Sequence, residues 1–134
     1  FYGDSRRRVF TTLPEGFEEP GYCALMIKTM HGTEDAANIW QDTWSEHLVK
    51  AGFKIGVASS ALFTRHNGEI RGLCHGDDFA VVAARADLLE FEAHLKTAFD
   101  IRRTGHLGFA YDCDTEIDVL KRVLRVDRSI SGGA

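Results

Sequence analysis

The chain has 134 residues, a formal net charge of -4 and 44% apolar residues, which fits one globular domain with a single modest core. Apolar residues are spread along the sequence and only two prolines occur, which argues against a disordered chain, and no apolar run reaches the roughly 18 residues of a membrane span. The acidic balance argues mildly against a nucleic-acid binder, although local clusters of arginine and lysine lie near both ends.

The sequence opens on FYGDSRRRVF, without an initiator Met, and we therefore expect a fragment of a longer protein. Its three cysteines, Cys23, Cys74 and Cys113, are odd in number and scattered, so we expect reduced thiols, with Cys74 inside a strand. The histidines stand at no metal-ligand spacing with the cysteines, which disfavours a zinc site. Four histidines are expected to face solvent without a role: His47, His66, His94 and His106.

The first half of the chain predicts two strands and a helix. Residues 9–12 form a short strand, LPEGFEEPG is a loop rich in proline and glycine, and residues 22–30 form a second strand. A helix follows over residues 33–51, with Thr33 as its N-cap and Gly52 at the position of a C-terminal cap. One apolar stripe runs along this helix: Ala36, Ala37, Trp40, Trp44 and Leu48.

The second half predicts a strand-rich region around another helix. ALFTR turns through HNGE, an Asn-Gly hairpin signal, into IRGLCH, and FAVVAA returns after GDD. A second amphipathic helix covers residues 86–99, and its apolar face carries Leu88, Phe91, Leu95 and Phe99. Weaker strands follow at 107–112 and 116–124. This order predicts an α+β fold, an antiparallel sheet with helices on one face.

Two adjacent aspartates, Asp77 and Asp78, lie between the two apolar runs in LCHGDDFAVV. Near-continuous apolar runs are typical of central strands covered on both faces, where two spare charges are unexpected. A tight turn can aim both carboxylates toward one side, and hard cations such as Mg²⁺ are their natural partners. Gly76 would let a phosphate or a nucleic-acid strand approach closely. The alternative interpretation is an ordinary solvated hairpin tip.

The segment LCHGDDFAVVA resembles motif C of the reverse transcriptases of Copia-type LTR retrotransposons, in which an aromatic residue, a variable residue and two aspartates separate apolar runs. Other segments of the chain are similar to that family, in the same order and with compatible spacing: VFTTLPEGFEEPG, MIKTMHGTEDAANIW, HLVKAGFKIGVASSALFTRHNGEI and FDIRRTGHLG. The resemblance covers nearly the whole chain.

The resemblance implies a partial polymerase palm, with part of the fingers, from a right-handed RNA-directed DNA polymerase. The intact enzyme would add deoxynucleotides to a primer 3′-OH through two Mg²⁺ (or Mn²⁺) ions. Its implied partners are an RNA or DNA primer–template, a deoxynucleoside triphosphate and the rest of the polyprotein, without a membrane. Its implied location is the cytoplasmic retrotransposon particle or the nucleus.

The motif match implies roles for individual residues. Asp77 and Asp78 would be catalytic metal ligands, and Arg102 would neutralise the leaving group. Six residues would shape the hairpin or contact nucleic acid: His75, Gly76, Phe79, Arg6, Arg7 and Arg8.

The sequence also departs from the family pattern. The third palm carboxylate is expected on the strand beside the hairpin and should precede Phe1, because Asp4 matches the loop that follows it. We therefore expect the chain alone to be inactive as a polymerase. On the fingers side, His31, Thr33 and Glu34 replace a tyrosine, a leucine and a basic residue, and Asp35 and Ala37 replace a glutamine and a proline. The acidic pair of Glu34 and Asp35 should repel phosphates, which fits a divergent lineage or a decayed copy equally.

Two other interpretations remain open. In a small α+β ferredoxin-like binding module without catalysis, Asp77 and Asp78 would only form a solvated hairpin turn. A nucleic-acid-binding remnant would show a salt-dependent affinity carried by Arg6, Arg7, Arg8 and Arg102.

Overall fold

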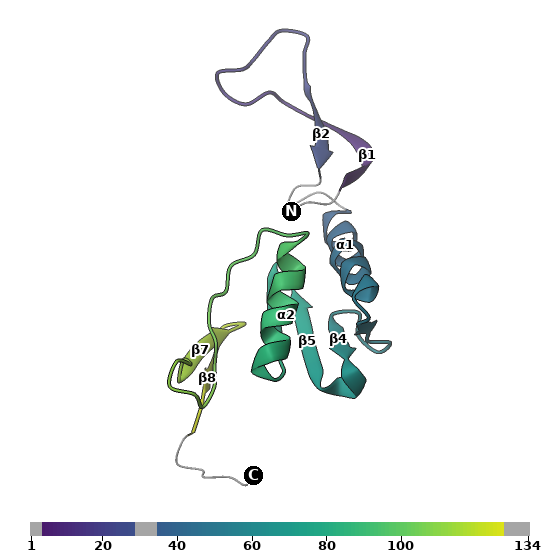
Figure 1. Ribbon diagram of the computed structural model, residues 1–134. Helices are drawn as coiled ribbons and strands as arrows, with labels where there is room; N and C mark the ends of the chain where they lie inside the picture. The colour runs from purple at the N-terminus through teal and green to yellow at the C-terminus, as the bar shows by residue number, and fades with distance from the viewer. Residues whose placement is uncertain (1–3, 29–34, 128–134) are drawn as a thin grey trace. The chain divides into compact units, whose positions relative to one another are not determined.

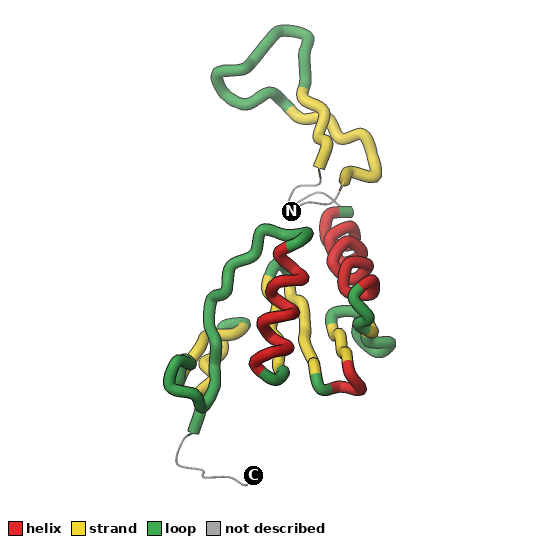
Figure 2. Tube along the Cα trace, viewed as in Figure 1, coloured by secondary structure: helices red, strands yellow, loops and turns green. Residues whose placement is uncertain are grey.

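The computed structural model describes residues 4–28 and 35–127 of the chain (Figure 1). The chain divides into two compact units, residues 1–99 and residues 100–134, and each is described by itself. Figure 2 shows the helices, strands and loops within them. The expected N-cap Thr33, together with His31 and Glu34, lies outside the described residues.

A two-stranded antiparallel ribbon opens the first unit. Strand β1 (Asp4–Thr11) pairs with β2 (Ala24–Lys28), with Phe10 opposite Leu25. The connecting loop contains two turns, in which the amide of Phe17 donates to the carbonyl of Pro14 and that of Tyr22 to Glu19. The expected loop is confirmed, and β1 begins earlier than expected because Asp4 also pairs with Lys28.

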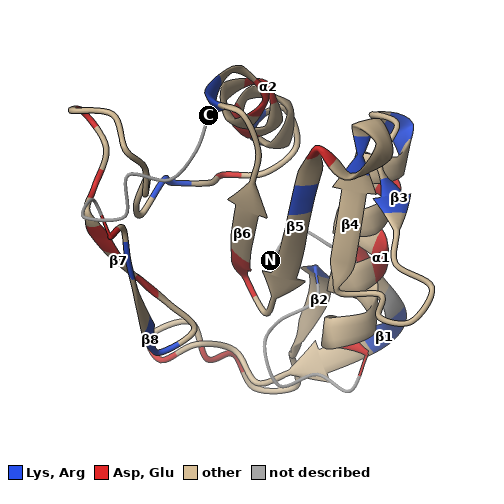
Figure 3. Ribbon diagram, turned by 90° about the horizontal axis from the view of Figure 1, so that it is seen from below, with Lys and Arg blue, Asp and Glu red and all other residues tan. Residues whose placement is uncertain are grey.

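Four antiparallel strands form the central sheet of the first unit, in the order β3-β4-β5-β6 (Figure 3). They are β3 (Lys54–Ile55), β4 (Leu62–Arg65), β5 (Ile70–His75) and β6 (Asp78–Val82). The Asn-Gly hairpin is confirmed between β4 and β5, where the short 3-10 helix η1 (His66–Gly68) makes the turn. Strand β3 has only two residues and was not predicted.

Two helices accompany this sheet. Helix α1 (Ala36–Lys50) is followed by Gly52 at its C-terminal cap, as expected. The φ of Gly52 is +84°, which glycine adopts easily. The amides of Gly52 and Phe53 donate to the carbonyls of Val49 and Leu48, a Schellman cap. Helix α2 (Arg85–Lys96) is shorter than expected, and Phe99 is buried beyond its end.

An aromatic cluster attaches both helices to the same face of the sheet. The rings of Trp44 in α1 and Phe91 in α2 each contact Phe63 on β4 and Phe79 on β6. Phe53 contacts both Phe63 and Phe91. The predicted arrangement, helices on one face of an antiparallel sheet, is confirmed for this unit.

The opposite face of the sheet is left uncovered by the helices. Because side chains alternate along a strand, the register places on this face Leu62, Thr64, Arg71, Leu73, His75, Asp78, Ala80 and Val82, of which none is buried. Val82 is 76% exposed, and β6 stands at the end of the strand order among the described residues. The expectation that these strands are covered on both faces is therefore wrong.

The second unit contains one small antiparallel hairpin. Strand β7 (Glu116–Val119) pairs with β8 (Arg122–Arg125), so the single strand expected over 116–124 is two strands. The turn residues Leu120 and Lys121 have φ values of 50° and 61°, which is the type I′ pattern. Asn and Gly usually mark this turn in a sequence, and neither occurs at these two positions. The strand expected at 107–112 is absent from this described segment, where Leu107 makes one isolated bridge to Asp114.

Two of the histidines expected to face solvent lie half-buried between α1 and α2. The imidazole rings of His47 and His94 stack with their centroids 4.1 Å apart, and each ring nitrogen Nε2 lies within 3.3 Å of the other residue's carbonyl oxygen. The solvent-facing prediction is wrong for this pair, because helical spacing alone did not show that the two helices approach there.

Leu48→Ala and Val49→Ala form a matched pair of core and surface substitutions in α1. Leu48 is 0% exposed and Val49 is 52% exposed. We expect Leu48→Ala to lower the free energy of unfolding by about 2–5 kcal/mol, because it leaves a cavity in the core. Val49→Ala should change it by less than about 0.5 kcal/mol. Urea denaturation followed by circular dichroism measures both, and equal effects would contradict the assigned helix orientation.

Gly72→Ala should destabilise the sheet although alanine is the smallest side chain that can be added. A Cβ atom at residue 72 would lie 2.3 Å from Cζ of the Phe63 ring, which is opposite it in the register. Since the Phe63 ring is enclosed by the aromatic cluster, we expect a loss of about 1–3 kcal/mol in the same denaturation experiment. The fully exposed Val57, replaced by alanine, serves as the control, and a neutral Gly72→Ala would contradict this packing.

Candidate functional site

Asp77 and Asp78, called the acidic pair from here on, lie at the two-residue hairpin turn between β5 and β6. His75 pairs with Asp78, so Gly76 and Asp77 are the two turn residues. Gly76 has a φ of +59°, whereas Asp77 is not among the described residues with positive φ, which is the pattern of a type II′ turn. An added Cβ at residue 76 would meet nothing within 4 Å, so glycine is favoured here by the backbone conformation and not by a lack of space.

The turn brings five of the predicted site residues together: His75, Gly76, Asp77, Asp78 and Phe79. The first four are exposed. Asp78 is the first residue of β6, on the uncovered face of the sheet beside His75, and Figure 3 shows acidic colour at the start of this strand. Phe79 points to the opposite, helix-covered face, where it contacts Trp44. Phe79 therefore supports the hairpin from the core side.

Side chains of α1 and β5 donate hydrogen bonds to the backbone of the turn. The indole N–H of Trp40 donates a hydrogen bond of 2.7 Å to the carbonyl oxygen of Gly76. The thiol of Cys74, a buried residue of β5, donates to the same oxygen over 3.5 Å. The pKa of the Cys74 thiol is raised from 9.0 to about 12, chiefly by burial and next by the Asp77 charge, whereas the hydrogen bond with Trp40 acts to lower it. The thiol is thus neutral beside the acidic pair.

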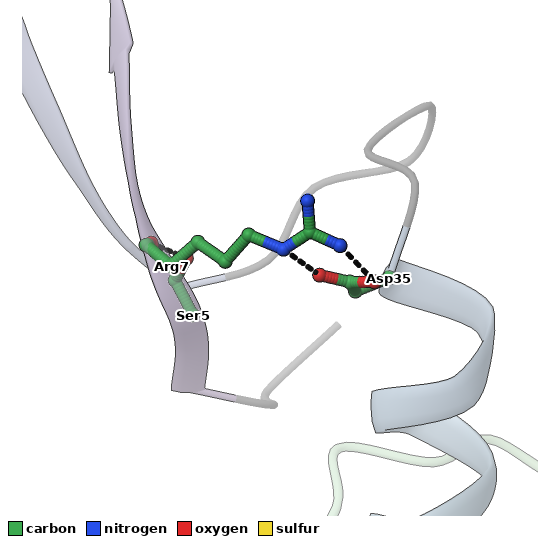
Figure 4. Close-up of polar contacts among 3 residues, drawn as sticks. All are labelled: Ser5, Arg7 and Asp35. Carbon is green, nitrogen blue, oxygen red and sulfur yellow. Dashed lines mark hydrogen bonds and ion pairs between the residues drawn. The ribbon is translucent and has the colours of Figure 1, made fainter.

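The arginines expected to bind nucleic acid lie elsewhere. Arg7 on β1 makes an ion pair with Asp35, in which Nε lies 2.7 Å from Oδ2 and Nη2 donates to Oδ1 over 2.9 Å (Figure 4). Nearby, the Ser5 hydroxyl donates to the Arg7 carbonyl oxygen. The ion pair with Arg7 offsets the negative charge of Asp35, which was expected to repel phosphates. Arg8 is exposed on the same strand, and Arg6 belongs to β1 as well.

Arg102 belongs to the second unit, where it is exposed. In the same unit the thiol of Cys113 lies 3.9 Å from Nδ1 of His106, a half-buried residue that was expected to face solvent. All three cysteines are free, as expected, and Cys74 lies in a strand.

Metal ligation at the turn depends on two carboxylates. Within residues 4–28 and 35–127, no group of three or more His, Cys, Asp or Glu side chains is placed to hold a metal ion. Asp4, which could be mistaken for the third metal-binding carboxylate, makes an ion pair with Lys28, with Oδ1 2.5 Å from Nζ. In these same residues, no helix has the length and apolar character to cross a membrane.

The sequence did not reveal the role of Trp40. We interpreted it as a core residue like Trp44, but Trp44 is buried, whereas Trp40 is half-buried and donates to the turn. A usable signal existed, since a tryptophan at the margin of an apolar stripe commonly directs its N–H to a polar partner. Which partner it reaches is a tertiary property, since Gly76 is 36 residues later in the chain.

Comparison of the chain with protein-family models, curated proteins and solved structures finds no significant match.

Cys74 should resist alkylation under conditions in which the exposed Cys23 reacts. With a pKa of about 12, the folded thiol ionises only as the pH approaches 12, whereas the unfolded thiol ionises around its ordinary value of 9.0. Rising pH therefore favours unfolding over this range, and Cys74 keeps its stabilising contribution below pH 9. We expect iodoacetamide to modify Cys74 about 100-fold more slowly than Cys23 at pH 8, measured by peptide mass spectrometry. Equal rates would contradict the burial of this thiol.

Proposed function

We propose that the chain is part of the reverse transcriptase of a Copia-type retrotransposon, and that Asp77 and Asp78 are two of the carboxylates that hold its catalytic metal ions. The observation that supports this most strongly is the position of the two aspartates. Both are exposed at a tight turn, and the sheet face that carries Asp78 is not covered by α1 or α2.

The two carboxylates suit Mg²⁺ or Mn²⁺. Magnesium prefers oxygen ligands and takes one or two protein carboxylates together with substrate phosphates and water. An exposed pair leaves room for those ligands, whereas the neutral Cys74 thiol beneath it is a poor competitor for a hard cation. When bound, two such ions would activate a primer 3′-OH and stabilise the departing pyrophosphate.

The surrounding sheet is compatible with a palm that receives a primer–template. His75 stands opposite Asp78 and Arg71 lies farther along β5 on the same uncovered face, where they could contact a nucleic-acid backbone. Leu73 and Ala80, which are opposite each other in the register, add apolar side chains to this face. The finer assignment, palm with part of the fingers, belongs to this proposal, as do the implied nucleotide substrate and polyprotein partners.

The outer edge of β6 suits the missing third carboxylate. Among the described residues β6 has a neighbour on one side only, so its other side can pair with one more strand. The family resemblance expects the third aspartate on a strand beside this hairpin. Without it the metal ions have too few fixed ligands, and we expect the isolated chain to lack polymerase activity.

Mn²⁺ titration tests the proposed site directly. We expect the chain to bind Mn²⁺ weakly, with a dissociation constant on the order of 1 mM, because only two carboxylates are fixed. Asp77→Asn should weaken binding about tenfold, since it removes a charged ligand. Water-proton relaxation enhancement measures the affinity. Glu69→Gln is the control, because this exposed carboxylate precedes β5 at the end of the strand far from the turn.

The outcomes separate the proposed function from a binding module without chemistry. If Asp77→Asn binds Mn²⁺ as well as the unaltered chain and Glu69→Gln do, the proposed metal site is wrong and the solvated-turn interpretation is favoured. Primer extension by the purified chain that Asp77→Asn abolishes would support the site but overturn the expected inactivity.

A further inference from the structure

The carbonyl group of Gly76 immediately precedes Asp77 and is held by a side chain from a distant helix. In a two-residue hairpin the ladder bonds join the flanking residues, here His75 and Asp78, and the carbonyl of the first turn residue has no ladder partner. The Trp40 indole supplies that partner with a hydrogen bond of 2.7 Å, and the Cys74 thiol approaches the same oxygen at 3.5 Å.

This bond fixes the direction of the peptide that carries Asp77. Types I′ and II′ turns differ mainly by rotation of the peptide between the two turn residues, which changes φ of the second residue from positive to negative. In the structure Asp77 has the type II′ conformation. Rotation of that peptide would turn the Gly76 carbonyl away from the indole and re-aim the Asp77 side chain. The hydrogen bond therefore opposes the rotation.

The Trp40 ring is itself held on two sides. Its centroid lies 6.4 Å from that of Phe79, the residue after Asp78, and 5.2 Å from that of Phe99, both in edge-to-face geometry. One side chain thus contacts the residue before the acidic pair and the residue after it. Because α1 is anchored in the core through Trp44 and Leu48, the indole gives the turn a rigid support.

We propose that Trp40 is a positioning residue for the acidic turn: its indole N–H locks the Gly76–Asp77 peptide so that Asp77 points to the metal site. The proposal rests on the proposed function, because it assigns to Trp40 a role in metal binding that acts through Asp77. It differs from a packing role in requiring the N–H group and not only the ring.

Trp40→Phe tests the N–H group while it keeps an aromatic ring in the same place. We expect Mn²⁺ affinity to fall about three- to tenfold, the equivalent of one lost hydrogen bond. Trp44→Phe is the matched control on the same helix, since Trp44 is buried and contacts Phe79 but makes no bond to the turn in the described structure. It should lower the free energy of unfolding and leave Mn²⁺ affinity unchanged.

A spectroscopic measurement reports on the Trp40 N–H group in the unaltered chain, with a variant used only to assign the signals. The chain has two tryptophans, so a ¹H–¹⁵N correlation spectrum contains two indole N–H signals, which Trp44→Phe assigns. Bound Mn²⁺ should broaden the Trp40 signal at lower concentrations than the Trp44 signal, because the Trp40 N–H is bonded next to Asp77. The Trp40 proton should also exchange with solvent more slowly than a free indole.

The outcomes distinguish this proposal from the proposed function. If Asp77→Asn does not weaken Mn²⁺ binding, the metal site itself fails. If Asp77→Asn weakens binding but Trp40→Phe does not, the site stands and the positioning role is overturned. A Trp40 indole proton that exchanges as fast as a free indole, or that Mn²⁺ bound at Asp77 leaves sharp, would overturn the positioning role as well.

Discussion

Phe63 is the residue on which the first unit depends. It is fully buried on β4, and its ring contacts Trp44 of α1, Phe91 of α2 and Phe79 of β6. Each aromatic side chain buries about 150–250 Å², so the cluster supplies a large part of the free energy that holds the helices on the sheet. Its ring also lies over Gly72, where no side chain fits. The cluster therefore determines which face of the sheet is filled and which is left for other uses.

That division of the sheet determines what the acidic turn can do. Phe79 is drawn into the aromatic cluster, and strand alternation then sends Asp78 to the opposite, exposed face. Trp40 reaches the turn from the same core side through the Gly76 carbonyl. The carboxylates of Asp77 and Asp78 are thus exposed to solvent, while the aromatic cluster packs behind the turn on the other face of the sheet. The arrangement fits a site that receives a ligand from the uncovered side.

Local signals in the sequence were sufficient for most elements of the first unit. Gly52 marked the end of α1, the Asn-Gly pair marked the β4–β5 hairpin, and apolar spacing identified both helices. Long-range features were not accessible. Nothing local shows that His47 meets His94, that Arg7 meets Asp35, or that Trp40 meets Gly76. The apolar run of β6 was misinterpreted because Val82 is exposed at the end of the sheet, where hydrophobicity does not report burial.

The β7–β8 hairpin has a thermodynamic consequence. None of the described residues from 100 to 127 is buried, so this segment has no interior of its own. A two-stranded hairpin without a buried core is marginally stable in water at best. Its melting should therefore contribute a broad, shallow heat absorption in a calorimetric scan, whereas the aromatic-centred portion gives the one sharp peak. The enthalpy per residue of the whole chain would then fall below that of an evenly packed protein of equal length.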